Sequence, residues 1–133
     1  MGQLDGKVAI VTGGGSGIGK GIAKAFADEG CSVVIAARNA DRLDAAAAEL
    51  SSDGGTVISI PTDVTNEEQM ISLFAKTMDQ FGKLDVLVNN SGAFDGGPVE
   101  ELTMEQWQKV IDVNVTGPFL GSREAFKIMK KQG

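Results

Sequence analysis

Residues 12–19 read Thr12-Gly13-Gly14-Gly15-Ser16-Gly17-Ile18-Gly19 and decide the fold of this chain. The β-branched run 7–12 that leads into them is typical of a strand buried on both faces. After them, Ile18, Ile22 and Phe26 recur at every fourth position, as apolar residues of a helix do, and Gly30 stands where a helix ends. Glycines at such a junction let the backbone approach a ligand, and the helix N-terminus offers free N–H groups. The stretch therefore predicts an anion-binding loop, with a tight turn that binds nothing as the simpler alternative.

A second phosphate-binding pattern overlaps this loop. Residues 14–20 fit the P-loop spacing of glycine, four residues, glycine and lysine. A P-loop needs Ser or Thr after that lysine to bind Mg²⁺, and Gly21 stands there instead. We therefore disfavour a nucleotide triphosphatase and expect Lys20 to be a solvated helix residue.

Strands and helices alternate along the rest of the chain. Further strands are expected over 32–37, 56–61 and 84–89, and helices between and after them, the last running from the cap at Thr103 to about Lys131. A capping box over 65–68 is expected to open the helix that precedes the fourth strand. About four strands alternating with helices predict an α/β fold with a doubly wound, parallel, Rossmann-like sheet that is incomplete, in one domain over 1–133. Ligands of such sheets bind beyond the carboxyl ends of the strands.

Composition excludes several classes of function. The chain has 133 residues, 18 of them acidic and 12 basic, so its net charge of −6 argues against nucleic-acid binding by broad charge neutralisation. It has no histidine, so we expect no imidazole base and no metal site. One cysteine, Cys31, cannot form an intrachain disulfide, and neither a signal peptide nor a membrane span is apparent. A cytoplasmic protein without a membrane partner fits best.

Four motifs occur in order over the whole chain: Thr12-Gly13-x-x-x-Gly17-x-Gly19, Asp63-Val64, Asn89-Asn90-Ser91-Gly92 and Asn114. Together they resemble the classical short-chain dehydrogenase/reductase family, with Ser91 where the family usually has alanine. The resemblance implies an oxidoreductase that transfers hydride between a nicotinamide cofactor and a carbonyl or alcohol substrate. Residues 1–133 would be its N-terminal NAD(P)-binding part.

The resemblance also implies which residues contact the cofactor. Asp63 would accept the adenine amino hydrogen and the Val64 backbone would complete the recognition of that edge, although Asp63 could equally be a turn or helix-start aspartate. Asn89 is interpreted as structural. The remaining cofactor-binding candidates lie in the glycine loop and after the fourth strand: Gly13, Gly15, Ser16, Gly17, Ile18, Gly19, Asn90, Ser91 and Gly92.

The end of the second strand bears on the choice between cofactors. Dinucleotide folds place an acidic residue about 20 positions beyond the glycine loop, where it binds the ribose hydroxyls and repels a 2′-phosphate. Here Ala37 fills that position, and Arg38 follows it. An arginine can bind a phosphate with two hydrogen bonds and stack on adenine, so NADP(H) is favoured over NAD(H). A solvated loop arginine is the alternative.

Asn114 is the one candidate catalytic residue, expected on the buried side of the last helix. Pro118 follows four residues later, lacks an N–H and clashes with the Asn114 carbonyl, so the sequence predicts a kink and a free carbonyl there. The family resemblance implies that this carbonyl holds a water in a proton relay to a catalytic lysine. A kink that serves only packing is the alternative.

The family's catalytic Ser, Tyr and Lys follow the helix that contains Asn114, and this chain has no tyrosine. We therefore expect a truncated part of a longer reductase, whose fourth strand is an apolar edge and which forms a homo-oligomer through that edge or the last helix. A non-catalytic dinucleotide-binding module is the rival hypothesis. A methyltransferase-type domain is weaker, because it leaves the 89–92 motif and Asn114 without a role.

Overall fold

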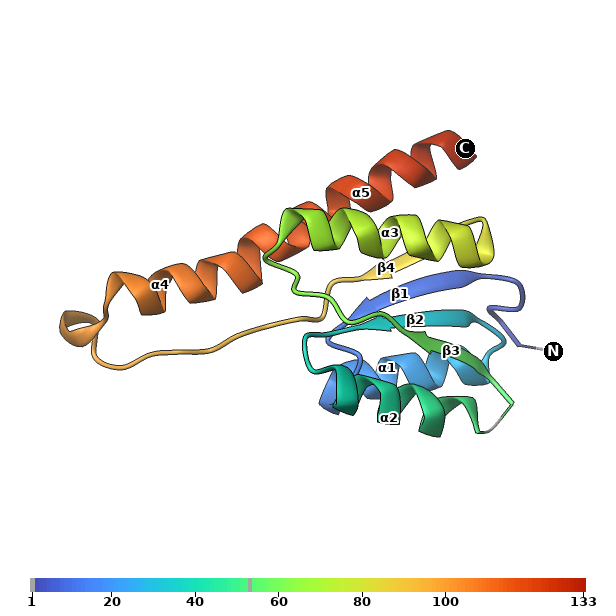
Figure 1. Ribbon diagram of the computed structural model, residues 1–133, viewed down its shortest axis with the longest axis horizontal. Helices are drawn as coiled ribbons and strands as arrows, with labels where there is room; N and C mark the ends of the chain where they lie inside the picture. Colours follow the sequence, from blue (N-terminus) through green and yellow to red (C-terminus); the bar gives the residue numbers. More distant parts are fainter. Residues whose placement is uncertain (1, 53) are drawn as a thin grey trace.

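The computed structural model of the protein describes residues 2–52 and 54–133. In this part of the chain, four parallel strands form one sheet in the order β3-β2-β1-β4. The strands are β1 (Val8–Thr12), β2 (Ser32–Ala36), β3 (Thr56–Ser59) and β4 (Val86–Val88). The helices are α1 (Gly17–Asp28), α2 (Ala40–Ser51), α3 (Glu67–Phe81), α4 (Met104–Ile111) and α5 (Gly117–Gln132), with a short 3-10 turn at Val99–Glu101. Figure 1 shows α1 and α2 on one face of the sheet and α3 and α5 on the other. The predicted doubly wound, Rossmann-like fold is confirmed.

The central strand β1 is buried along its whole length, as predicted. Ala9 and Val11 pack into the core under α1 and α2, whereas Ile10 packs into the core under α3 and α5. Alternate side chains of one strand therefore reach two separate cores, which explains why the run shows no alternation of polar and apolar residues. β4 lies at an edge of the sheet and its residues are only half buried, in agreement with the predicted apolar edge.

Helix α1 packs on the sheet through small residues. Ala23 and Ala27 are buried, Ile22 and Phe26 are partly buried, and Ile18 is 79% exposed. The four-residue apolar repeat therefore identified the helix correctly, and its first apolar residue, Ile18, lies outside the core. Gly19 in the first turn of α1 is buried, and a Cβ there would lie 2.1 Å from the Gly13 carbonyl oxygen.

The predicted capping box over 65–68 is wrong. The N-cap of α3 is Asn66, whose side-chain oxygen accepts a hydrogen bond from the Gln69 N–H at 3.0 Å. The N–H and hydroxyl of Thr65 both donate to Asp63, which holds Thr65 in the turn before the helix. At the other predicted cap, Thr103 and Gln106 form the reciprocal pair of a true capping box.

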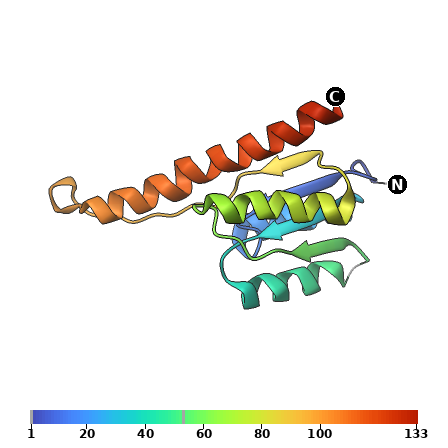
Figure 2. The same cartoon turned by 45° about the horizontal axis from the view of Figure 1, so that its top comes forward.

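The last helix is interrupted at residues Asp112–Thr116, which form a π-helical segment between α4 and α5. Pro118 has no N–H for the Asn114 carbonyl, and the bonding pattern changes so that the Gly117 N–H donates to the Asp112 carbonyl. In place of the predicted kink lies this π-helical segment, and Figures 1 and 2 show α4 and α5 as one long rod that projects past the sheet. Because α4 lies beyond the core, it has no buried residue and Asn114 is exposed, contrary to the prediction. No helix of residues 2–52 and 54–133 is long and apolar enough to span a membrane.

Two glycines of α1 should respond to alanine with opposite signs. A Cβ at Gly19 would collide with backbone, whereas a Cβ at Gly21 would meet no atom within 4 Å. We expect Gly21→Ala to raise the free energy of unfolding by about 0.5–1 kcal/mol through helix propensity, and Gly19→Ala to lower it by about 1–3 kcal/mol. Urea denaturation checks both variants. Equal effects would contradict the close approach at Gly19.

The single thiol should report on the folded state. Burial, with a smaller contribution from the negative charge of Asp85, raises the pKa of Cys31 to about 11, and the residue is 2% exposed. Since only the thiolate is alkylated, iodoacetamide at pH 8 should label native Cys31 about a hundredfold more slowly than the urea-unfolded chain. Intact-mass spectrometry of both samples measures the ratio, and rapid labelling of the native protein would contradict the packing around β2.

Candidate functional site

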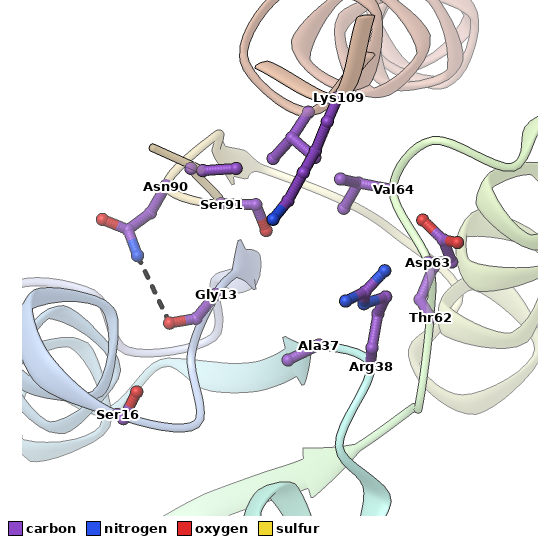
Figure 3. Close-up of a pocket in the computed structure, with 13 residues that line it drawn as sticks. Gly13, Ser16, Ala37, Arg38, Thr62, Asp63, Val64, Asn90, Ser91 and Lys109 are labelled. Atoms are coloured by element: carbon purple, nitrogen blue, oxygen red, sulfur yellow. Dashed lines mark hydrogen bonds between the residues drawn. The ribbon is translucent and has the colours of Figure 1, made fainter. Parts of the chain in front are cut away.

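A cavity of about 380 Å³ lies where the carboxyl ends of β1, β2 and β4 meet. Its walls come from the glycine loop, from the segments after β2, β3 and β4, and from the start of the last long helix. Figure 3 shows these side chains around one opening. Eight of the predicted cofactor-binding residues line it, namely Gly13, Ser16, Arg38, Asp63, Val64, Asn90, Ser91 and Gly92.

One buried hydroxyl holds two walls of this cleft together. Thr12, 2% exposed at the end of β1, accepts hydrogen bonds from the N–H groups of Asn90 at 3.0 Å and Ser91 at 3.1 Å. The same hydroxyl donates to the Val88 carbonyl at 3.3 Å, which uses its one donor and both acceptor positions. The turn after β4 is thereby fixed against the glycine loop. The sequence showed Thr12 only as the first residue of the glycine motif, and the signal for its role was a hydroxyl directly after four apolar strand residues.

The glycine loop lies too close to its neighbours for side chains. Gly13 has φ +68°, and a Cβ there would lie 2.9 Å from the Asn90 amide nitrogen. A Cβ at Gly14 would lie 2.6 Å from the Ile35 Cγ2 atom of β2. The Asn90 side chain donates to the Gly13 carbonyl at 3.3 Å. The backbone itself therefore forms this part of the cleft surface.

The N-terminus of α1 fits an anion. Its N-cap residue Ser16 makes no capping hydrogen bond, and the first turn carries no acidic side chain. The first N–H groups of the helix are thus left without a side-chain acceptor at a point where the helix dipole favours negative charge. Ser16 lines the cleft, so a phosphate at this end would meet the helix terminus.

Arg38 and Asp63 lie at the opposite end of the cleft from Ser16 (Figure 3). Burial raises the pKa of Asp63, but hydrogen bonds from the Thr65 hydroxyl and N–H and the charge of Arg38 outweigh it and hold the pKa below its usual value. The Asp63 carboxylate accepts these bonds at 2.7 and 2.9 Å. Asp63 therefore acts as a turn aspartate and also lines the cleft.

Five predicted site residues do not line the cavity, namely Gly15, Gly17, Ile18, Gly19 and Asn114. Asn114 instead binds the loop that follows β4. Its side-chain oxygen accepts from the Ala93 N–H at 3.0 Å, and its amide donates to the Ala93 carbonyl at 2.7 Å. Ala93 lines the cleft, so Asn114 holds a residue of the cleft wall in place without lining the cleft itself. Asn89 is exposed and donates to the Ser122 hydroxyl at 3.2 Å, which agrees with its structural interpretation.

Sequence analysis missed the contribution of the last helix to the cleft. Lys109 of α4 and Val113 of the π-helical segment both line it. The two residues are four positions apart, so they share one face of a helix, and that spacing was the available signal. Over residues 2–52 and 54–133, no group of three or more His, Cys, Asp or Glu side chains could hold a metal ion.

Comparison with curated proteins finds relatives that match nearly the whole chain. Glucose 1-dehydrogenase 2 of Bacillus subtilis is 44% identical over 97% of this chain and 51% of its own length. The 3-oxoacyl-[acyl-carrier-protein] reductase of Synechocystis is 40% identical over 99% of this chain and 54% of its own length. The chain thus spans about half the length of the curated relatives it matches.

Solved structures show the same fold in related sequences. A short-chain type dehydrogenase/reductase from Mycobacterium marinum superimposes with a TM-score of 0.94 at 36% identity, over 97% of this chain and 52% of that one. The family model described as short chain dehydrogenase matches residues 7–133. With the fold, the glycine loop and the sequence in agreement, the chain belongs to the short chain dehydrogenase family.

Proposed function

We propose that this chain is the cofactor-binding part of an NADP(H)-dependent oxidoreductase that transfers hydride between the nicotinamide and a carbonyl or alcohol substrate. The family uses nicotinamide cofactors, and the preference for NADP(H) is the finer step. It rests on one observation, that Ala37 and Arg38 line the cleft where an acidic side chain would repel a 2′-phosphate. A guanidinium there can bind the phosphate instead.

The residues of the cleft fit such a cofactor. Its backbone wall at Gly13 has no room for a Cβ, and the uncapped start of α1 at Ser16 would hold the pyrophosphate. Asp63 and Val64 would hold the adenine. The turn 90–92, which Thr12 fixes in place, would contact the ribose. When bound, the cofactor supplies the hydride chemistry, and the protein supplies its placement.

Asn114 has a proposed role in positioning and proton transfer. Its side chain is committed to Ala93, and its carbonyl cannot receive a bond from Pro118. We propose that this carbonyl holds a water that relays a proton in the intact reductase. The Asn114 side chain fixes the Ala93 backbone and so holds the cleft wall after β4 against the last long helix.

The substrate is assigned only as a small carbonyl or alcohol compound, because the named relatives act on a sugar and on an acyl chain attached to a carrier protein. A homo-oligomer is proposed from the exposed apolar side chains along α4, the π-helical segment and α5: Met104, Trp107, Val115, Phe119 and Phe126. Exposed apolar residues at this density favour association.

Reversing the charge at residue 38 tests the cofactor preference. Arg38→Asp should lower the ratio of NADPH affinity to NADH affinity by about tenfold or more, because a cation that attracts the 2′-phosphate is replaced by an anion that repels it. Fluorescence titration of both cofactors measures the ratio. Lys76→Asp, the same charge change on α3, is the control and should leave the ratio unchanged. An unaltered ratio in Arg38→Asp would overturn the NADP(H) assignment.

The mass and turnover of the protein from its native source distinguish the reductase from a non-catalytic dinucleotide-binding module. A reductase should have an intact mass well above the 13.8 kDa of this chain and should oxidise NADPH with at least one simple aldehyde or ketone. Mass spectrometry and the NADPH absorbance decay at 340 nm check this. A 13.8 kDa protein that binds NADPH without any turnover would favour the binding module.

A further inference from the structure

Lys109 brings a second positive charge to the cleft from a different part of the chain than Arg38. It lies on α4, with 56% of its side chain exposed, and it lines both the main cavity and an adjoining hollow of about 420 Å³. Arg38 also lines both spaces. In Figure 3 the two side chains extend into the opening from opposite sides, Lys109 from the helix and Arg38 from the end of β2.

The nearby carboxylates neutralise the positive charges of Lys109 and Arg38 only weakly. Lys109 lies 3.9 Å from an oxygen of Asp95, at the limit of an ion pair, and the other oxygen of Asp95 accepts from Gln106 at 3.2 Å. Arg38 influences Asp63, but that carboxylate is engaged with Thr65.

Other charged groups face the adjoining hollow. Glu105 and Asp112 contribute to its walls, and Asp112 accepts from Gln108 at 2.7 Å. Among the described residues, no ion pair joins Arg38 to any carboxylate. Two like charges that share one opening repel each other, and an anion placed between them would remove that cost.

We propose that Lys109 and Arg38 together bind the 2′-phosphate of NADP(H), from opposite sides of the cleft. The inference rests on the proposed function and extends it, because it places a specificity-determining residue on the last helix. A phosphomonoester carries nearly two negative charges and three acceptor oxygens, so it can pair with both cations at once. The pyrophosphate is the other anionic group of the cofactor, but its expected place is the start of α1, at the Ser16 end of the cleft.

The experiment compares NADPH and NADH dissociation constants by fluorescence titration of the full chain. Lys109→Gln should weaken NADPH binding about fivefold and change NADH binding less than twofold, the difference expected for one partly exposed charge contact. Lys131→Gln removes the same charge near the far end of α5 and is the matched control, expected to change neither. Lys109→Arg keeps the charge and should bind NADPH within about twofold of the wild type.

A shorter probe isolates the phosphate. By calorimetry, the dissociation constant of adenosine 2′,5′-bisphosphate should rise about fivefold in Lys109→Gln, whereas that of adenosine 5′-monophosphate should be the same in both proteins. If Lys109→Gln weakens NADPH and NADH equally, or weakens neither, the inference is wrong while the proposed function stands. If the wild-type chain binds neither dinucleotide, the proposed function itself fails. Circular dichroism of each variant confirms that it is folded.

Discussion

The cleft depends on the hydroxyl of Thr12, which holds the turn after β4 against the end of β1. The sheet order β3-β2-β1-β4 means that the chain winds outward in one direction from β1 and then returns to build on its other side. At that reversal, the connections from β1 and β4 lead away on opposite faces and leave a crevice between them. The pairing of β1 with β4 extends only to Val11 and Val88, so the turn that follows β4 needs a further tie to stay in place. The Thr12 bonds to Asn90, Ser91 and Val88 supply it within a buried environment, where hydrogen bonds are poorly replaced by water.

Close backbone contact then determines which residues can form the floor. Gly19 lies against the Gly13 carbonyl, and Gly14 lies against Ile35, so the start of α1 is brought directly to the ends of β1 and β2. The first N–H groups of α1 are thereby brought to the edge of the cleft, which Ser16 lines. A side chain at any of these positions would push the helix outward and separate the anion-binding terminus from the rest of the site.

Charge is arranged locally in an otherwise acidic protein. The chain carries a net charge of −6, yet Arg38 and Lys109 both reach the cleft, and the start of α1 adds its own positive end. A local positive site on a negative molecule attracts a small anionic ligand without attracting polyanions such as nucleic acid. This arrangement explains how a protein of low isoelectric point can hold a phosphate-rich cofactor.

Much of the fold, and eight of the residues that line the cleft, could be predicted from the sequence. The buried run of β1, the glycine loop and the alternation of strands and helices are local patterns, and each is set by near neighbours in the chain. A local pattern failed where a segment leaves the core: Asn114 was expected on the buried side of the last helix, but it is exposed where that helix projects past the sheet. Likewise, Asn66 rather than Thr65 caps α3, and Thr65 is bonded to Asp63 instead, a choice that residue propensity does not show.

The sequence by itself determined the fold class, the glycine loop between β1 and α1 and the family, because these depend on glycines, strand runs and motif order along the chain. Only the tertiary structure decided which side chains share the cleft. Thr12 bonds to Ser91, and Lys109 lines the same cavity as Arg38, across separations of about 70 residues or more in the sequence, which no local periodicity predicts. The order of the strands in the sheet and the position of the last helix beside it bring these residues together.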